Sequence, residues 1–136
     1  MAVIAAPTPP TGFSAPAALR SAAWFAAAGL ALGATHALTG WGLPCPWRLL
    51  TGTLCPLCGA TTMASRLLSG DLAGAWAANP FVLVGTVLAG GAVLAWLVEA
   101  RGGPALRPPA ALRRPAIWWT GLGLAALTFM VWRNLG

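Results

Sequence analysis

The sequence is short of charged residues. Only 7% of its 136 residues are charged, just two are acidic, and lysine and tyrosine are absent. A water-soluble globular domain carries roughly 25% charged residues, because its surface faces water. The shortage excludes an ordinary soluble domain. Together with 58% hydrophobic residues, it indicates that most of the outer surface faces lipid.

The same shortage limits the chemistry. Asp71 and Glu99 are the only carboxylic side chains, which leaves little material for general acid–base catalysis. The motifs of P-loop NTPases, zinc proteases and serine hydrolases are missing. The net charge of +6 comes from arginines near the ends of apolar stretches. This is a membrane pattern, so we expect no nucleic-acid partner, and whether the protein is an enzyme stays open.

Three apolar stretches are long enough to cross a bilayer: residues 21–38, 80–98 and 116–132. We favour a retained first span, and its alternative is a signal peptide. The pattern predicts an all-α membrane protein with about three transmembrane helices. Residues 19–136 would form a single membrane domain, and the Pro/Ala-rich residues 1–18 a flexible tail.

The arginines also predict the orientation in the cell membrane. With the N-terminus in the cytoplasm, five arginines lie inside and three outside. Four of those five lie in the short loop 101–114, and cytoplasmic loops carry such an excess. We therefore expect the N-terminus and loop 101–114 to be cytoplasmic and loop 39–79 to be extracytoplasmic.

Loop 39–79 is too interrupted to cross the membrane and too apolar to lie free in water. Its apolar residues recur at helical spacing from Met63 to Trp76, which predicts a short interfacial or re-entrant helix. Asp71 is a candidate cap for a helical turn that begins at Leu72. A pair between Arg66 and Asp71 is disfavoured, because residues five apart do not face each other on a helix.

All three cysteines lie in this loop. Cys55 and Cys58 form a C-x-x-C pair that can bind one metal ion from a tight turn, and Gly59 would relieve the strain of that turn. Cys45 is a candidate third ligand and His36 a candidate fourth, with zinc the metal that such ligands indicate. A complete zinc site normally has two ligand pairs, and only one pair is present.

Two other interpretations of the cysteines stay open. Cys55 and Cys58 are also candidate redox residues, because a helix N-terminus can lower the pKa of one thiol of such a pair. Two of the three cysteines could then form a disulfide on the outer face. Alternatively, all three pack as small buried residues.

The loop carries an ordered motif that resembles a bacterial membrane protein family, domain of unknown function 2752, over roughly residues 40–98. The matching positions are Cys45, Pro46, Thr51, Gly52, Cys55, Pro56, Cys58, Gly59, Thr61, Gly70, Asp71, Ala75, Asn79 and Pro80. The family pattern continues after Thr61 with an arginine, where this sequence has Thr62. Arg66, one helical turn later, is the nearest candidate for that charge. The resemblance implies a small multi-pass protein with a cysteine-bearing loop and no assigned reaction.

The sequence thus favours a multi-pass membrane protein whose cysteine loop forms a binding or structural site at the membrane interface, with zinc as the candidate ion. The first alternative is a membrane thiol–disulfide oxidoreductase or redox sensor. The second is an accessory subunit, because Ala- and Gly-rich spans can need other membrane proteins, or a second copy, as partners in the lipid bilayer.

Overall fold

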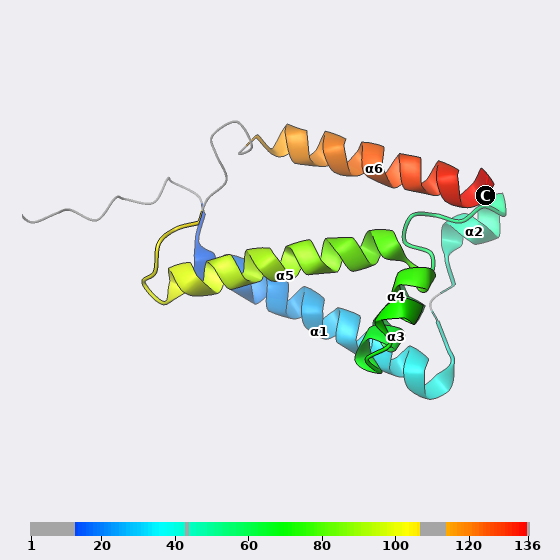
Figure 1. Ribbon diagram of the computed structural model, residues 1–136, viewed down its shortest axis with the longest axis horizontal. Helices are drawn as coiled ribbons and strands as arrows, with labels where there is room; N and C mark the ends of the chain where they lie inside the picture. Colours follow the sequence, from blue (N-terminus) through cyan, green and yellow to red (C-terminus); the bar gives the residue numbers. More distant parts are fainter. Residues whose placement is uncertain (1–12, 43, 107–113, 136) are drawn as a thin grey trace, which may run out of the picture.

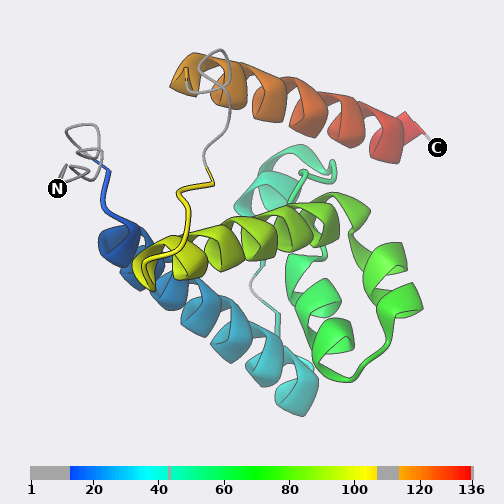
Figure 2. The same cartoon turned by 60° about the vertical axis from the view of Figure 1, so that its left-hand side comes forward.

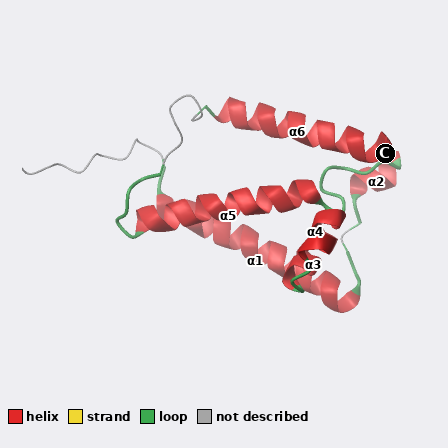
Figure 3. Cartoon of the chain, viewed as in Figure 1, coloured by secondary structure: helices red, strands yellow, loops and turns green. Residues whose placement is uncertain are grey.

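The computed structural model describes residues 13–42, 44–106 and 114–135, and within these ranges it contains helices and no strands (Figures 1 and 3). The helices are α1 (Ala15–Thr39), α2 (Pro46–Thr51), α3 (Ala60–Leu68), α4 (Leu72–Ala78), α5 (Pro80–Ala100) and α6 (Pro115–Leu135). Helices α1, α5 and α6 are long and apolar enough to span a membrane. The expected all-α fold with three candidate spans is confirmed, and each predicted span lies inside one of these helices.

Helix α1 begins earlier than expected. Ser14 caps it by accepting a hydrogen bond from the Ala17 N–H at 3.3 Å, and a proline occupies the first turn, where no partner for its nitrogen is needed. The helix therefore starts inside the stretch 1–18 that we predicted as a tail. Residues 1–12 of that stretch lie outside the described residues, as do residues 107–113 of the predicted cytoplasmic loop.

The segment between α1 and α5 folds into three short helices. The single apolar face expected from Met63 to Trp76 is divided between α3 and α4, because Gly70 adopts a left-handed conformation (φ 78°) and breaks the helix. Asp71 then caps α4 by accepting from the Gly74 N–H at 2.8 Å, as predicted. Met63 is buried, whereas Trp76 is 56% exposed.

Helix α3 packs against α1 and α4, and α1 also packs against α5. Gly33 of α1 makes the first of these contacts possible: a Cβ there would lie 2.9 Å from the Ala64 Cβ. Helix α6 is not packed in this way against any other described helix, and both views show it lying apart from α1 and α5 (Figures 1 and 2). Its C-terminal end lies at the same end of the molecule as the cysteine loop (Figure 1).

Most of the buried residues among those described lie in the segment between α1 and α5, and the others are Ala15 and Gly33 of α1. Along the three candidate spans, the most apolar windows are 6%, 0% and 0% buried, as expected of helices that face lipid. Among the described residues, the buried ones between α2 and α5 are Cys58, Met63, Ala75 and Asn79. The most enclosed part of the protein is thus the short-helix region at one end of the spans.

Candidate metal site

The three cysteine side chains converge. Cys45 precedes the first residue of α2, and Cys55 and Cys58 lie in the turn that joins α2 to α3. The Cys55 Sγ lies 3.2 Å from the Cys45 Sγ and 3.3 Å from the Cys58 Sγ. All three sulfurs lie within 4.8 Å of one another. The sequence had named Cys55 and Cys58 as a pair and Cys45 as a candidate third ligand, and the structure brings all three together.

Helix α2 and the turn after it return the chain from Cys45 to Cys55. The helix ends at Gly52, which has a φ of 72°. The hydroxyls of Thr51 and Thr53 lie 2.8 Å apart, and the indole N–H of Trp47 donates to the Thr53 hydroxyl at 2.9 Å. The motif positions Thr51 and Gly52 therefore close the loop that brings Cys45 to the other two thiols.

The C-x-x-C turn is tight. The Cys58 N–H donates to the Cys55 carbonyl at 3.1 Å, and the Cys55 N–H points at the Cys58 Sγ at 3.3 Å. Gly59 follows in the left-handed region with a φ of 86°. A Cβ at Gly59 would lie 2.8 Å from the Ala78 carbonyl oxygen, so both the conformation and the space require glycine, as expected.

The Asn79 side chain holds this turn in place through hydrogen bonds. Its side chain is fully buried, and its amide donates to the carbonyls of Pro56 and Cys58, each at 2.9 Å. Its amide oxygen accepts from the Val82 N–H at 2.9 Å and so caps α5, where Pro80 occupies the first turn. One motif residue thus connects the cysteine turn to the start of the second span.

The last turn of α6 also reaches the cysteine turn. Arg133 donates to the Cys58 carbonyl at 2.8 Å and to the Ala78 carbonyl at 2.9 Å. Asn134 exchanges two hydrogen bonds with the backbone of Leu54, at 2.8 and 2.9 Å. The sequence pattern indicated Arg133 only as one of the arginines near the ends of apolar stretches, and it did not indicate Asn134. A polar pair at the very end of an apolar span was the one signal available.

The thiols differ in their environments. The pKa of Cys45 lies below its ordinary value, mainly because the backbone N–H of Arg48 bonds to its sulfur, with a further contribution from the Cys55 thiol. Burial raises the pKa of Cys58 to about 11, and its contact with the Cys55 thiol adds to this effect. Cys45 is therefore the thiol more easily ionised, and Cys58 the one held neutral in the metal-free protein.

The three cysteines line a cavity of about 1010 Å³, together with residues of α2, the start of α3 and Leu32 of α1. No other Cys, His, Asp or Glu among the described residues belongs to the group. These three thiols could hold a metal ion.

His36 is not brought to the three sulfurs. Its Nε2 lies 3.2 Å from the Thr62 hydroxyl, and its Nδ1 is buried without a partner among the described residues. Thr61 lines the cavity beside the cysteines. Thr62, the residue that follows it, thus contacts the candidate fourth ligand.

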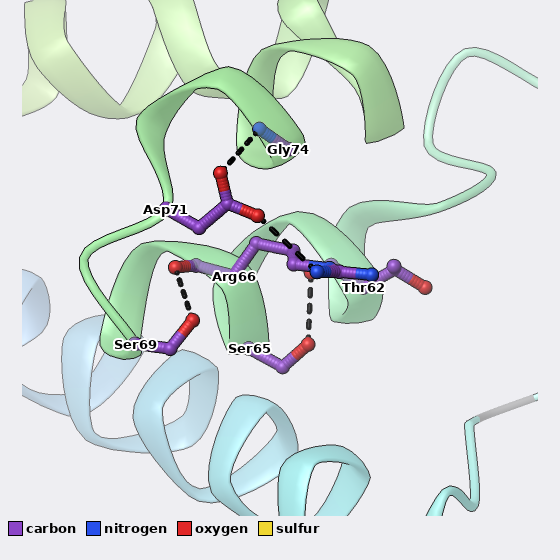
Figure 4. Close-up of polar contacts among 6 residues, drawn as sticks. All are labelled: Thr62, Ser65, Arg66, Ser69, Asp71 and Gly74. Carbon is purple, nitrogen blue, oxygen red and sulfur yellow. Dashed lines mark hydrogen bonds and ion pairs between the residues drawn. The ribbon is translucent and has the colours of Figure 1, made fainter.

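Arg66 lies on the exposed side of α3 and pairs with Asp71 at 3.2 Å (Figure 4). The sequence spacing disfavoured this pair on a continuous helix, and the pair forms because the break at Gly70 turns Asp71 back over α3. The Arg66 and Asp71 side chains are 58% and 38% exposed, respectively. Exposed ion pairs contribute little to stability, and this pair lies outside the group of three thiols.

Comparison with known proteins agrees with the motif. Residues 45–93 match the family described as protein of unknown function (DUF2752), which confirms the resemblance over that part of the chain. No curated protein and no solved structure matches. The matched stretch begins at Cys45 and contains all three thiols, so the candidate metal site lies within the family region.

Proposed function

We propose that this protein binds one metal ion at the membrane interface through Cys45, Cys55 and Cys58, and that the ion is zinc. The observation that carries the proposal is the convergence of three sulfurs within 4.8 Å from a segment of only 14 residues, 45–58. Thiolates are preferred ligands of zinc, at about 2.3 Å from the ion. Tetrahedral coordination at that length separates the sulfurs by about 3.8 Å, so the two shortest sulfur pairs need to widen by only about half an ångström.

The number of thiols argues for a metal over a disulfide. A disulfide joins two sulfurs and leaves the third outside, whereas a metal ion uses all three. The arrangement also supports a function in binding, because a zinc ion with three protein ligands keeps its fourth position for water or another ligand. That position would face the cavity lined by the cysteines.

The same contacts support one other function. Cys55 lies against both neighbours, at 3.2 and 3.3 Å, and thiol–disulfide exchange needs such a central sulfur. In this alternative, Cys45 and Cys55 first receive a disulfide by exchange with an external disulfide. The Cys58 thiolate then attacks the Cys55 sulfur, the Cys55–Cys58 bond forms, and Cys45 leaves as a thiolate.

One experiment separates the two. The protein is purified in detergent without reductant, and metal content and free thiols are measured on the same sample. We expect about one zinc ion per chain, and loss of the ion in each of the variants Cys45→Ser, Cys55→Ser and Cys58→Ser. Asp71→Asn is the matched control, because it removes a carboxylate outside the group and keeps a capping residue. One free thiol and no metal would overturn the zinc proposal in favour of the exchange mechanism.

His36→Gln tests the predicted fourth ligand in the same assay. We expect this variant to keep its zinc, because His36 bonds to Thr62 and is not part of the group. Loss of zinc would make His36 a ligand and would replace the open fourth position by a closed one.

We further propose that the cysteine loop faces the extracytoplasmic side, on the argument of the arginine distribution. A membrane-impermeant thiol reagent, added to intact cells after chelation and mild reduction, should label the cysteines. Labelling only after lysis would place the loop in the cytoplasm, where the reducing environment favours metal binding over disulfides.

A further inference from the structure

The last turn of α6 attaches to both ends of the C-x-x-C turn. Arg133 donates from one guanidinium nitrogen to the Cys58 carbonyl and from another to the Ala78 carbonyl, at 2.8 and 2.9 Å. Asn134 pairs with the N–H and the carbonyl of Leu54, the residue before Cys55. The backbone on either side of the two thiols is therefore held by two neighbouring side chains from a distant part of the sequence.

These bonds are a large part of what attaches α6. The helix is not packed along its length against another described helix. Near its C-terminal end, the Phe129 ring stacks on Phe81 at 5.4 Å, and the Arg133 guanidinium lies 5.7 Å from the centre of the Phe129 ring. The third span thus meets the rest of the described protein mainly at the cysteine loop.

Arg133 is half-buried and is bonded to the backbone of Cys58, one of the proposed ligands. Groups in this position, behind the ligands, orient them and adjust their affinity for the metal.

We propose that Arg133 and Asn134 are positioning residues of the three-thiol site, which keep the C-x-x-C turn closed. The metal part of this inference rests on the proposed zinc binding. The third span would then control how tightly the ion is held, although its residues lie outside the matched family region.

The test compares Arg133→Gln, Arg133→Lys and Asn134→Ala with Leu135→Ala, an adjacent control whose side chain is 84% exposed. The first readout is the alkylation rate of Cys58 in reduced, metal-free protein, followed by mass spectrometry. The second readout is the zinc dissociation rate. Loss of a group behind a metal ligand typically changes affinity by about 10–100-fold, so we expect Arg133→Gln and Asn134→Ala to raise both rates about tenfold and Leu135→Ala to leave them unchanged.

Arg133→Lys keeps the positive charge and tests the geometry of the two hydrogen bonds. An ammonium lacks the planar fork that bonds two carbonyls at once, so Arg133→Lys should restore only part of the closure, with both rates between those of the wild-type protein and of Arg133→Gln.

The outcomes are distinct. Unchanged Cys58 alkylation in both Arg133→Gln and Asn134→Ala would overturn the positioning role. If the wild-type protein binds no zinc, the proposed function fails, and the alkylation rates still decide whether α6 holds the turn. Should Arg133→Gln fail to fold, Arg133→Lys and Asn134→Ala provide the same comparison.

Discussion

Replacing Asn79 by alanine should destabilise the fold around the cysteine turn. The side chain is fully buried and makes three hydrogen bonds, to the carbonyls of Pro56 and Cys58 and from the Val82 N–H. Loss of a helix cap costs about 1 kcal/mol, and leaving the half-buried Pro56 carbonyl unpartnered costs about 1–3 kcal/mol. The Cys58 carbonyl keeps the hydrogen bond from Arg133, so the total is about 2–4 kcal/mol.

The assay is thermal unfolding of the reduced, metal-free protein in detergent, followed by circular dichroism. For a chain of this size, each kcal/mol lowers the Tm by about 3–4 °C, which predicts a decrease of about 6–16 °C for Asn79→Ala. Asn79→Ser keeps an oxygen that can cap α5 and should recover about 1 kcal/mol. Asp71→Ala removes the cap of α4 together with the exposed ion pair to Arg66, which contributes little, and should cost about 1 kcal/mol.

Comparing Asn79→Ala with Asp71→Ala separates the free energy of the hydrogen bonds to the cysteine turn from the free energy of capping a helix. If Asn79→Ala lost no more than Asp71→Ala, the bonds to Pro56 and Cys58 would contribute nothing measurable, and the account of a braced turn would be refuted.

Three further outcomes follow from the same geometry. Gly59→Ala should cost about 1–3 kcal/mol from its left-handed conformation alone, and more from the clash with the Ala78 carbonyl. Gly85→Ala is the control, because a Cβ there meets nothing within 4 Å. Equal Tm values for the Gly59→Ala and Gly85→Ala variants would contradict the structure. In metal-free protein at pH 8, Cys45 should be alkylated before Cys58. The alkylation rate of Cys58 should keep rising up to about pH 11, because burial raises the pKa of that thiol to about 11. Mass spectrometry that shows Cys58 reacting first would contradict this prediction. Arg66→Ala should change the free energy of unfolding by less than about 1 kcal/mol, and a larger loss would contradict an exposed ion pair.

The three spans could be predicted from the sequence because they depend on local properties. Length and hydrophobicity decide whether a helix can cross the bilayer, and both are visible in a single stretch of sequence. The first residue of each helix depends on capping as well as hydrophobicity. Helix α1 begins at Ala15 because Ser14 caps it, and the Pro/Ala-rich composition of that stretch does not reveal the cap.

The site was predictable only in part. The spacing of Cys55 and Cys58 indicates a tight turn, but the approach of Cys45 depends on α2 and the threonine contacts that follow it. The spacing of Arg66 and Asp71 disfavours an ion pair on one continuous helix. The break at Gly70 ends that helix and brings the two side chains together.

The contacts of α6 with the cysteine turn could not be predicted from the sequence, because they join distant parts of the chain. Asn134 bonds to Leu54 across 80 positions of the chain, and Arg133 bonds to Cys58 across 75. Such contacts depend on how the spans are arranged, and neither periodicity nor the motif contains that information.

The most direct test of the three-thiolate metal site is X-ray absorption at the zinc edge of the purified protein loaded with one equivalent of zinc. We expect three sulfur neighbours at about 2.3 Å and one lighter neighbour at about 2.0–2.2 Å. Two or fewer sulfur neighbours at the bound zinc, or failure of the reduced protein to retain zinc, would contradict the account.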